Sequence, residues 1–212
     1  MDTTQKDKRL FVSTIVLVVF HLVGIVGILS SYRDVFLHLT PFNLILSSAL
    51  LFINQKAINK KFYIICAIVF TLGYLVELVG VKTGLIFGSY RYGSTLGYKV
   101  MDIPLIIGLN WLMLIFSVGC ICHKIKASVY IKSLIGALMM VALDLLIEPV
   151  AMKYDFWQWK DSIIPLQNYV AWFLTSTLLL ILINKLDFDK NNKLAQALYI
   201  TQMVFFSILC LN

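Results

Sequence analysis

The chain has 212 residues, of which 60% are apolar and 14% are charged, and its formal net charge is +7. Soluble domains contain about 45–50% apolar and about 25% charged residues, so this composition is typical of an integral membrane protein. Seven membrane-spanning helices of about 20 residues each would leave about 70 residues for loops. We therefore expect a single membrane domain over residues 1–212, and we exclude a large soluble catalytic or nucleic-acid-binding domain.

Apolar runs separated by charged or turn-forming loops predict an all-α, polytopic bundle of about seven transmembrane helices. The first run has no small-residue cleavage site of the signal-peptide kind, so we expect an uncleaved helix. The second run contains Pro41, which membrane helices tolerate. The predicted helices occupy residues 10–30, 36–54, 62–82, 103–123, 128–149, 169–186 and 195–211.

The distribution of basic residues predicts how the bundle is oriented. Counted on alternate sides of the predicted helices, 12 Lys and Arg residues lie on the side of the N-terminus and 6 on the other side. Cytoplasmic loops are enriched in Lys and Arg, so we expect a multi-pass protein of the cell membrane with a cytoplasmic N-terminus. The basic residues form no continuous stripe, and no nucleic-acid partner is expected.

Three carboxyl groups fall inside predicted helices. Glu77 lies in the third helix, and Asp144 and Glu148 share one face of the fifth, because they are four residues apart. All three are predicted in the outer half of the membrane, at a depth similar to that of Asn110 and Trp111 in the fourth helix. Each carboxylate opposes membrane insertion by about 2.5–3.5 kcal/mol, whereas an interhelical hydrogen bond returns about 0.6 kcal/mol. A functional site is therefore favoured over purely structural hydrogen bonding.

The two longest loops, 83–102 and 150–168, are predicted on the same outer side as the carboxyl groups. The first is rich in Gly and Tyr but matches no phosphate-binding glycine motif. The second contains Trp157 and Trp159, and Trp172 follows in the next helix. These aromatic side chains form either an interfacial belt or the mouth of a substrate site.

Sequence motifs for metals and cofactors are missing. The last predicted helix, 195–211, has no lysine for a retinal Schiff base. Asp187 and Asp189 lie in a lysine-rich loop rather than in an aspartate-rich magnesium motif. The pair Cys120 and Cys122 has no second pair of zinc ligands. We therefore expect neither a metal nor another cofactor.

Two stretches carry a recognisable pattern of fixed spacings. They read E-x-x-G-x-x-T-G-x-x-F-G-x-Y-x-Y-x-x-x-L-G-x-K, from Glu77 to Lys99, and D-x-x-x-E-P-x-A…W-x-W…P-x-x-N-Y-x-x-W, from Asp144 to Trp172. Together they resemble the membrane carotenoid biosynthesis family that includes the CruF-type carotenoid hydratases and bisanhydrobacterioruberin hydratase. The resemblance is strong over 77–172, and the flanking helices match in hydropathy alone.

The resemblance implies a hydro-lyase of the carotenoid 1,2-hydratase type. Such an enzyme adds water, without a cofactor, to the terminal double bond of an acyclic carotenoid end group and leaves a tertiary hydroxyl. The implied partners are a lipophilic polyene substrate and the lipid bilayer, and association with other carotenoid enzymes is compatible with them. The resemblance does not identify the carotenoid that serves as the substrate.

The chemistry of hydration also fits the residues themselves. A carboxyl group in a medium of low dielectric keeps its proton near neutral pH and can act as a general acid, for which Asp144 is the deepest candidate. Glu77 and Glu148 would stay ionised, position water and stabilise the cation. The candidate substrate-binding residues are Asn110, Trp111, Tyr90, Tyr92, Trp157, Trp159, Asn168 and Trp172.

Other functions remain open at this point. Buried acids in a seven-helix bundle are also typical of a proton-coupled transporter or channel. The aromatic loops and the family spacing favour an enzyme, and no internal repeat of the transporter kind is present. A non-catalytic membrane assembly subunit is a third interpretation. Within the enzyme class, isomerisation or cyclisation of the same polyene end would also begin with protonation.

Overall fold

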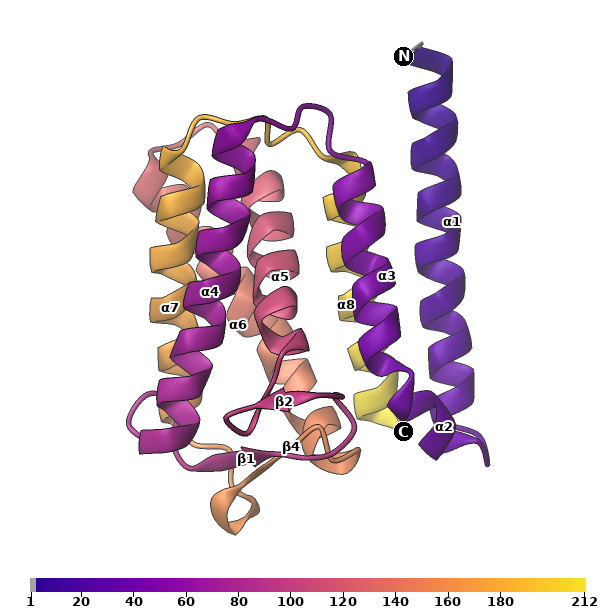
Figure 1. The fold of residues 1–212 in the computed structure, drawn as a ribbon, viewed down its shortest axis with the longest axis vertical. Coiled ribbons are helices and arrows are strands. Elements are labelled where there is room, and N and C mark those ends of the chain that lie inside the picture. The colour runs from indigo at the N-terminus through magenta and orange to yellow at the C-terminus, as the bar shows by residue number, and fades with distance from the viewer. Residues whose placement is uncertain (1–2) are drawn as a thin grey trace.

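The computed structural model describes residues 3–212, which form a helical bundle closed at one end by two short β-ribbons (Figure 1). Within these residues, six helices are long and apolar enough to span a membrane. The predicted all-α membrane bundle is thereby confirmed, and the chain is a multi-pass membrane protein. The six helices are α1 (Thr3–Ile28), α4 (Lys60–Thr83), α5 (Ile106–His123), α6 (Val129–Lys153), α7 (Leu166–Lys185) and α8 (Lys193–Leu211).

The second predicted helix, 36–54, is divided in two. α2 (Arg33–His38) and α3 (Thr40–Ile53) meet at Leu39. Pro41 lies in the first turn of α3, where its missing N–H is not needed, so the break falls where a new helix can begin. α3 has 14 residues and is about 21 Å long, which is shorter than the hydrocarbon core of about 30 Å. This run therefore supplies a short seventh apolar helix.

α5 is the central helix (Figure 1), and most of its residues are buried. It packs against α3, α4, α6, α7 and α8. Glycine allows α4 to approach it closely: a Cβ atom at Gly73 would lie 2.5 Å from the Trp111 Cβ. On the facing helix, a Cβ atom at Gly108 would lie 3.0 Å from the Phe70 ring. The two glycines bring α4 and α5 together at the level where both helices carry polar residues.

The outer loops form antiparallel ribbons rather than irregular structure. β1 (Tyr90–Tyr92) pairs with β4 (Trp157–Trp159), and β2 (Lys99–Val100) pairs with β3 (Ile103–Pro104). The second pair takes the first two residues of the predicted fourth helix, so α5 begins at Ile106. Both ribbons lie at the end of the bundle opposite the start of α1 (Figure 1).

A close backbone contact at Gly93 fixes the β1–β4 ribbon. A Cβ atom at this position would lie 1.9 Å from the carbonyl oxygen of Asp155, so only glycine fits. The N–H of Gly93 donates a hydrogen bond to the Phe156 carbonyl at 2.9 Å. The Thr95 hydroxyl donates to the Asp155 carbonyl, also at 2.9 Å. The loop after β1 is thus held against the turn before β4.

α6 extends beyond its predicted end at residue 149. Pro149 lies inside the helix, and the N–H of Tyr154 still donates to the Val150 carbonyl at 3.0 Å. The extra turn leads into β4, and a short 3₁₀ helix, η1 (Lys160–Ser162), connects β4 to α7. The end of α6 therefore sits directly beside the ribbon.

Candidate active site

The three predicted carboxyl groups are buried near the ribbon end of the bundle. Glu77 is 4% exposed, Asp144 is fully buried and Glu148 is 1% exposed. Glu77 comes from α4, and the other two occupy successive turns of α6. Because buried polar groups need partners, the hydrogen bonds of these carboxyls define the site.

Glu77 accepts three hydrogen bonds from neutral donors. The Tyr90 hydroxyl donates to Oε2 in a short contact, and the Tyr92 hydroxyl donates to the same oxygen at 2.7 Å. The Trp111 indole N–H donates to Oε1 at 2.9 Å. Burial, together with the negative charge of Glu77, raises the pKa of Tyr90 and of Tyr92 well above the ordinary value of a phenol. Both phenols therefore keep their protons and act as donors.

Glu148 also accepts three hydrogen bonds. The indole N–H groups of Trp157 and Trp159 donate to its Oε2, at 2.9 and 2.6 Å. The side-chain amide of Asn168, on α7, donates to Oε1 at 3.0 Å. The same amide nitrogen donates to Asp144 Oδ2 at 2.9 Å, so Asn168 bridges the two carboxyl groups of α6.

Asp144 differs from the two glutamates in its hydrogen bonding. It accepts one hydrogen bond, from Asn168, and its other oxygen, Oδ1, is buried without a hydrogen-bond partner. An unpaired buried oxygen is costly, and a bound proton is one way to change that oxygen from acceptor to donor. The protein therefore fills more of the hydrogen-bonding capacity of Glu77 and Glu148 than of Asp144.

The register of the ribbon explains why four donors reach the two glutamates. Tyr90 lies opposite Trp159, and Tyr92 lies opposite Trp157. Alternate residues of a strand point to the same face, so all four side chains project toward the bundle. The ring centroids are 4.8 Å apart in the first pair and 6.0 Å apart in the second. The ribbon is therefore an aromatic cover with its polar atoms directed at Glu77 and Glu148.

A small cavity lies between the ribbon and the helices. Its volume is about 30 Å³, which is room for about one or two water molecules. Trp111 and Trp172 form a stack in its wall, with ring centroids 4.4 Å apart. Asp144 and Glu148 are not part of this wall and lie behind Asn168 and the ribbon tryptophans. The lining residues are Glu77, Phe87, Tyr90, Tyr92, Ile107, Asn110, Trp111, Trp157, Trp159, Asn168 and Trp172.

The structure thus brings all eleven predicted site residues into one region, nine in the cavity wall and two beside it. Phe87 and Ile107 also line the cavity and were not predicted from the sequence. Ile107 precedes Trp111 by one helical turn, so it shares the same helix face, and this spacing was a usable signal. Trp159 and Trp172 are only 5% and 7% exposed, so these two side chains are not part of an interfacial belt.

A second, polar depression of about 620 Å³ lies on the outer face of the ribbon. Tyr90 and Trp159 line both this depression and the inner cavity, so these two residues lie between them. Arg91, Asp155 and Lys160 make the outer depression strongly polar.

A metal site is not part of this arrangement. Across residues 3–212, no three His, Cys, Asp or Glu side chains are grouped so that they could hold a metal ion. The chemistry available in the wall is that of one carboxyl group, two phenols, two side-chain amides and four indoles. Such a set can transfer protons, orient water and stabilise a cation against aromatic faces.

The chain is similar in sequence to known proteins. The chain is 28% identical over 125 residues to the bisanhydrobacterioruberin hydratase of Haloarcula japonica, and the alignment covers 55% of this chain and 42% of that protein. The chain therefore matches less than half the length of this relative. No solved structure matches it significantly. Residues 37–212 match the family described as carotenoid biosynthesis protein, and since this match covers most of the chain, the chain belongs to that family.

Proposed function

We propose that the protein hydrates an acyclic carotenoid: it adds water to the terminal double bond of an end group and produces a tertiary alcohol. Family membership supports a carotenoid-modifying role, and the name of the relative from Haloarcula japonica supports hydration. The observation that carries the proposal is a water-sized cavity that has a carboxyl group and stacked indoles in its wall. These are the three components that hydration of an alkene requires.

In the proposed reaction, a carboxylic acid donates its proton to the less substituted carbon of the terminal double bond. The new C–H bond leaves a positive charge on the tertiary carbon. The faces of Trp111 and Trp172 can stabilise that cation by about 2 kcal/mol in a site shielded from water. A water molecule then forms the C–O bond, and a carboxylate accepts the proton that it loses. The net change is the addition of one H₂O.

We assign the proton donor to Asp144. Glu77 and Glu148 each accept three hydrogen bonds, which leave little room for a proton on either oxygen. Asp144 Oδ1 accepts no hydrogen bond, so this oxygen can carry the proton that is donated. Glu77 lies in the cavity wall, where an ionised carboxylate would orient water and attract the cation.

Substrate binding requires the site to open. A cavity of about 150 Å³ is needed for a ring the size of benzene, whereas this one measures about 30 Å³. The five-carbon end of a carotenoid therefore fits only if the ribbon or Asn168 moves. Such a movement would also bring Asp144 into contact with the double bond, since Asn168 stands between Asp144 and the cavity.

Proton-coupled transport is the alternative that the sequence left open. It would need a polar route through the bundle. Between Trp111 and His123, the central helix α5 has no Asp, Glu, Lys or Arg. Its side chains from Leu112 to Phe116 are buried and apolar. The apolar character of this stretch of the central helix favours a reaction confined to the ribbon end of the bundle.

The decisive experiment is expression in a host that accumulates an acyclic carotene, followed by mass analysis of the pigments. Hydration predicts products heavier by one water for each modified end. Isomerisation or cyclisation would leave the mass unchanged, and so would a transporter or an assembly subunit. Pigments of unchanged mass, in cells that contain the protein in the membrane, would refute the proposal.

We also propose that the protein lies in the cell membrane with its N-terminus in the cytoplasm. The excess of Lys and Arg on that side supports this orientation. The carboxyl cluster and the ribbon would then face the outer side.

A further inference from the structure

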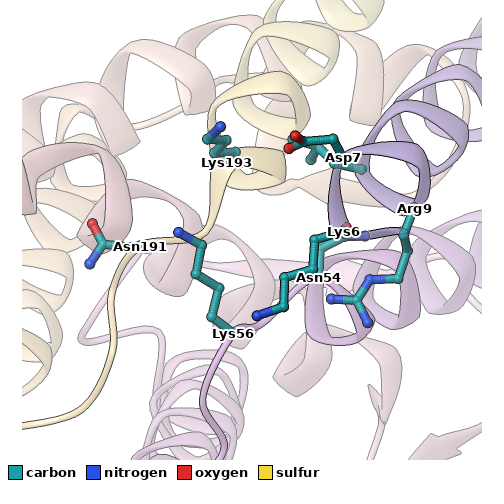
Figure 2. Close-up of a pocket in the computed structure, with 8 residues that line it drawn as sticks. Lys6, Asp7, Arg9, Asn54, Lys56, Asn191 and Lys193 are labelled. Atoms are coloured by element: carbon teal, nitrogen blue, oxygen red, sulfur yellow. The ribbon is translucent and has the colours of Figure 1, made fainter. Parts of the chain in front are cut away.

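A depression at the end of the bundle opposite the ribbon has the features of a binding site (Figure 2). Its volume is about 250 Å³. Three separate segments form it: the start of α1, the segment that follows α3 and the segment that leads into α8. The lining residues are Lys6, Asp7, Arg9, Leu10, Asn54, Lys56, Asn191 and Lys193.

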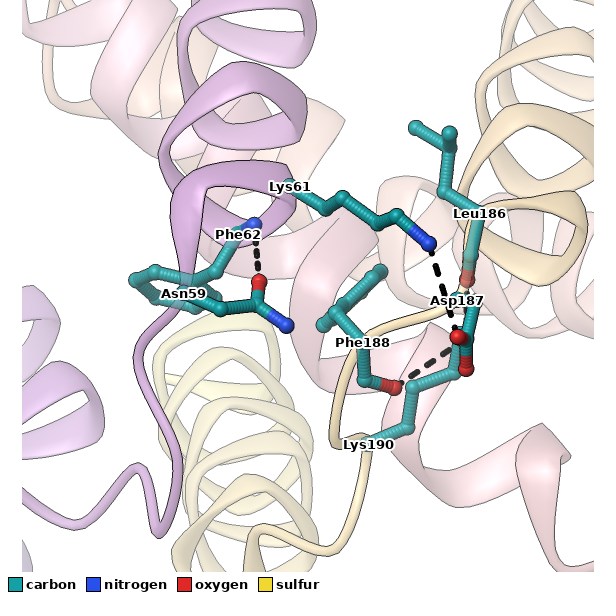
Figure 3. Close-up of polar contacts among 7 residues, drawn as sticks. All are labelled: Asn59, Lys61, Phe62, Leu186, Asp187, Phe188 and Lys190. Carbon is teal, nitrogen blue, oxygen red and sulfur yellow. Dashed lines mark hydrogen bonds and ion pairs between the residues drawn. The ribbon is translucent and has the colours of Figure 1, made fainter.

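The depression has an excess of positive charge, because four of its residues are basic and one is acidic. Figure 2 shows that the basic side chains come from all three segments. Within residues 3–212, the lysine trio (Lys6, Lys56 and Lys193) makes no ion pair. Lys61, nearby in the sequence, does pair with Asp187, at 3.5 Å (Figure 3). Converging like charges repel each other, and a bound anion would relieve that repulsion.

Buried amides hold the three segments in place beneath the charges. The side-chain N–H of Asn54, which is 7% exposed, donates to the Ser13 hydroxyl at 2.8 Å and so ties the end of α3 to α1. The side-chain N–H of Asn192, which is 3% exposed, donates to the Leu51 carbonyl at 2.7 Å and ties the start of α8 to α3. The convergence of the basic residues is therefore built into the packing of three helices.

Apolar surface continues directly from the charged depression. Leu10 belongs to its wall, and the next turns of α1 present Phe11, Val12 and Ile15, which are 66%, 56% and 45% exposed. In a multi-pass membrane protein these side chains face lipid chains. A ligand that fits both surfaces has an anionic head and apolar tails.

We propose that this depression binds the phosphate headgroup of an anionic membrane phospholipid. Basic pockets between transmembrane helices, at the level of the headgroups, are suited to such lipids. Inorganic phosphate carries the same charged group but has no apolar tails, so it is the competing ligand in the test. The site is separate from the carboxyl cluster and does not depend on the proposed hydration.

The test uses the full chain in detergent, titrated with phosphatidylglycerol or phosphatidylcholine and followed by native mass spectrometry. The test variant is K6Q/K56Q/K193Q. The matched control, K60Q/K124Q/K126Q, removes the same charge from exposed positions at the same end of the bundle. We expect the test variant to bind phosphatidylglycerol about 100-fold more weakly, because each basic residue near an anionic lipid contributes to affinity. The control should bind it as the wild-type chain does.

Three results would overturn the proposal. Equal weakening in both variants would show a general effect of surface charge. Equal affinity of the wild-type chain for phosphatidylcholine would show that the anion is not recognised. Complete displacement of phosphatidylglycerol by millimolar inorganic phosphate would assign the site to a soluble phosphate. The thermal melting of lipid-free protein checks folding, and K56Q against K124Q repeats the comparison with a single change.

Discussion

Replacement of Asp144 by Asn should remove the proposed proton donor while it leaves the packing of α6 almost unchanged. Asn168 donates to Asp144 Oδ2 at 2.9 Å, and the carbonyl of an asparagine can accept that bond. The new NH₂ group would replace Oδ1, which has no partner, so no hydrogen bond is broken. We expect the free energy of unfolding to change by about 1 kcal/mol or less. Loss of a general acid should lower turnover by about 10²–10⁴-fold.

The assay compares pigments with protein in the same cells. The D144N variant is expressed in a host that accumulates an acyclic carotene, and hydrated products are normalised to the amount of chain in the membrane. D161N is the matched control, because it makes the same chemical change at an exposed position of η1. It should retain full turnover. E148Q should behave differently from both variants, because Glu148 accepts N–H groups on both of its oxygens. The NH₂ group of a glutamine would replace one of these oxygens, and two hydrogen-bond donors would then face each other.

Two results would contradict the assignment of Asp144 as the proton donor. Near-normal hydration by D144N would show that Asp144 is not the essential acid, and Glu77 in the cavity wall would become the leading candidate. Failure of D144N, E148Q and E77Q to accumulate at all would favour a structural role for the three carboxyls as interhelical hydrogen-bonding groups.

Four further predictions follow from the same structure. W159F removes the N–H that Glu148 accepts at 2.6 Å, and it should lower both turnover and stability, the latter by about 1–3 kcal/mol, measured as product yield and melting in detergent. G93A should abolish hydration, because its Cβ would lie 1.9 Å from the Asp155 carbonyl oxygen and separate the ribbon strands, which amide exchange would detect. Cys210, exposed at the end of α8, should react with an impermeant thiol reagent in intact cells. Turnover by the purified protein should survive chelators and dialysis.

Each of these has its own control. G24A is matched to G93A, since a Cβ at Gly24 would make an ordinary contact of 3.4 Å with Phe205, and it should be silent. K126C, in a chain without Cys210, reports the opposite face and should stay unlabelled until the cells are opened. Labelling of K126C in intact cells would reverse the orientation. A requirement for a metal or nucleotide in the purified system would contradict the protonation mechanism, and full activity of W159F would remove that indole from the site.

Hydropathy was sufficient to predict the bundle but not the ends of its helices. The apolar runs gave seven helices in the right order, because burial of backbone groups in lipid leaves a helix as the available structure. The break at Leu39 and the continuation of α6 through Pro149 depend on local backbone geometry, which a hydropathy pattern does not contain. The short length of α3 was for the same reason not foreseen.

The polar layer was predictable, and its hydrogen bonds were not. The cost of a carboxylate in lipid pointed to Glu77, Asp144 and Glu148 as a group. Their donors come from β1 and β4, whose pairing joins two loops far apart in the sequence. The sequence showed aromatic residues in both loops but carried no signal for the register that sets Tyr90 against Trp159. That register depends on the positions of the helices between them.

The pairing of β1 with β4 also sets an order of assembly. The two strands flank α5 and α6, so the ribbon can form only after both helices have crossed the membrane and both loops lie on the same side. Four of the six donors to Glu77 and Glu148 belong to this ribbon. During insertion these carboxyls must find other partners, such as water at the membrane surface. The hydrogen bonds of the site can therefore be completed only after α5, α6 and the start of α7, which carries Asn168, are in place, and errors in the insertion of α5 or α6 would leave Glu77 and Glu148 without most of their donors.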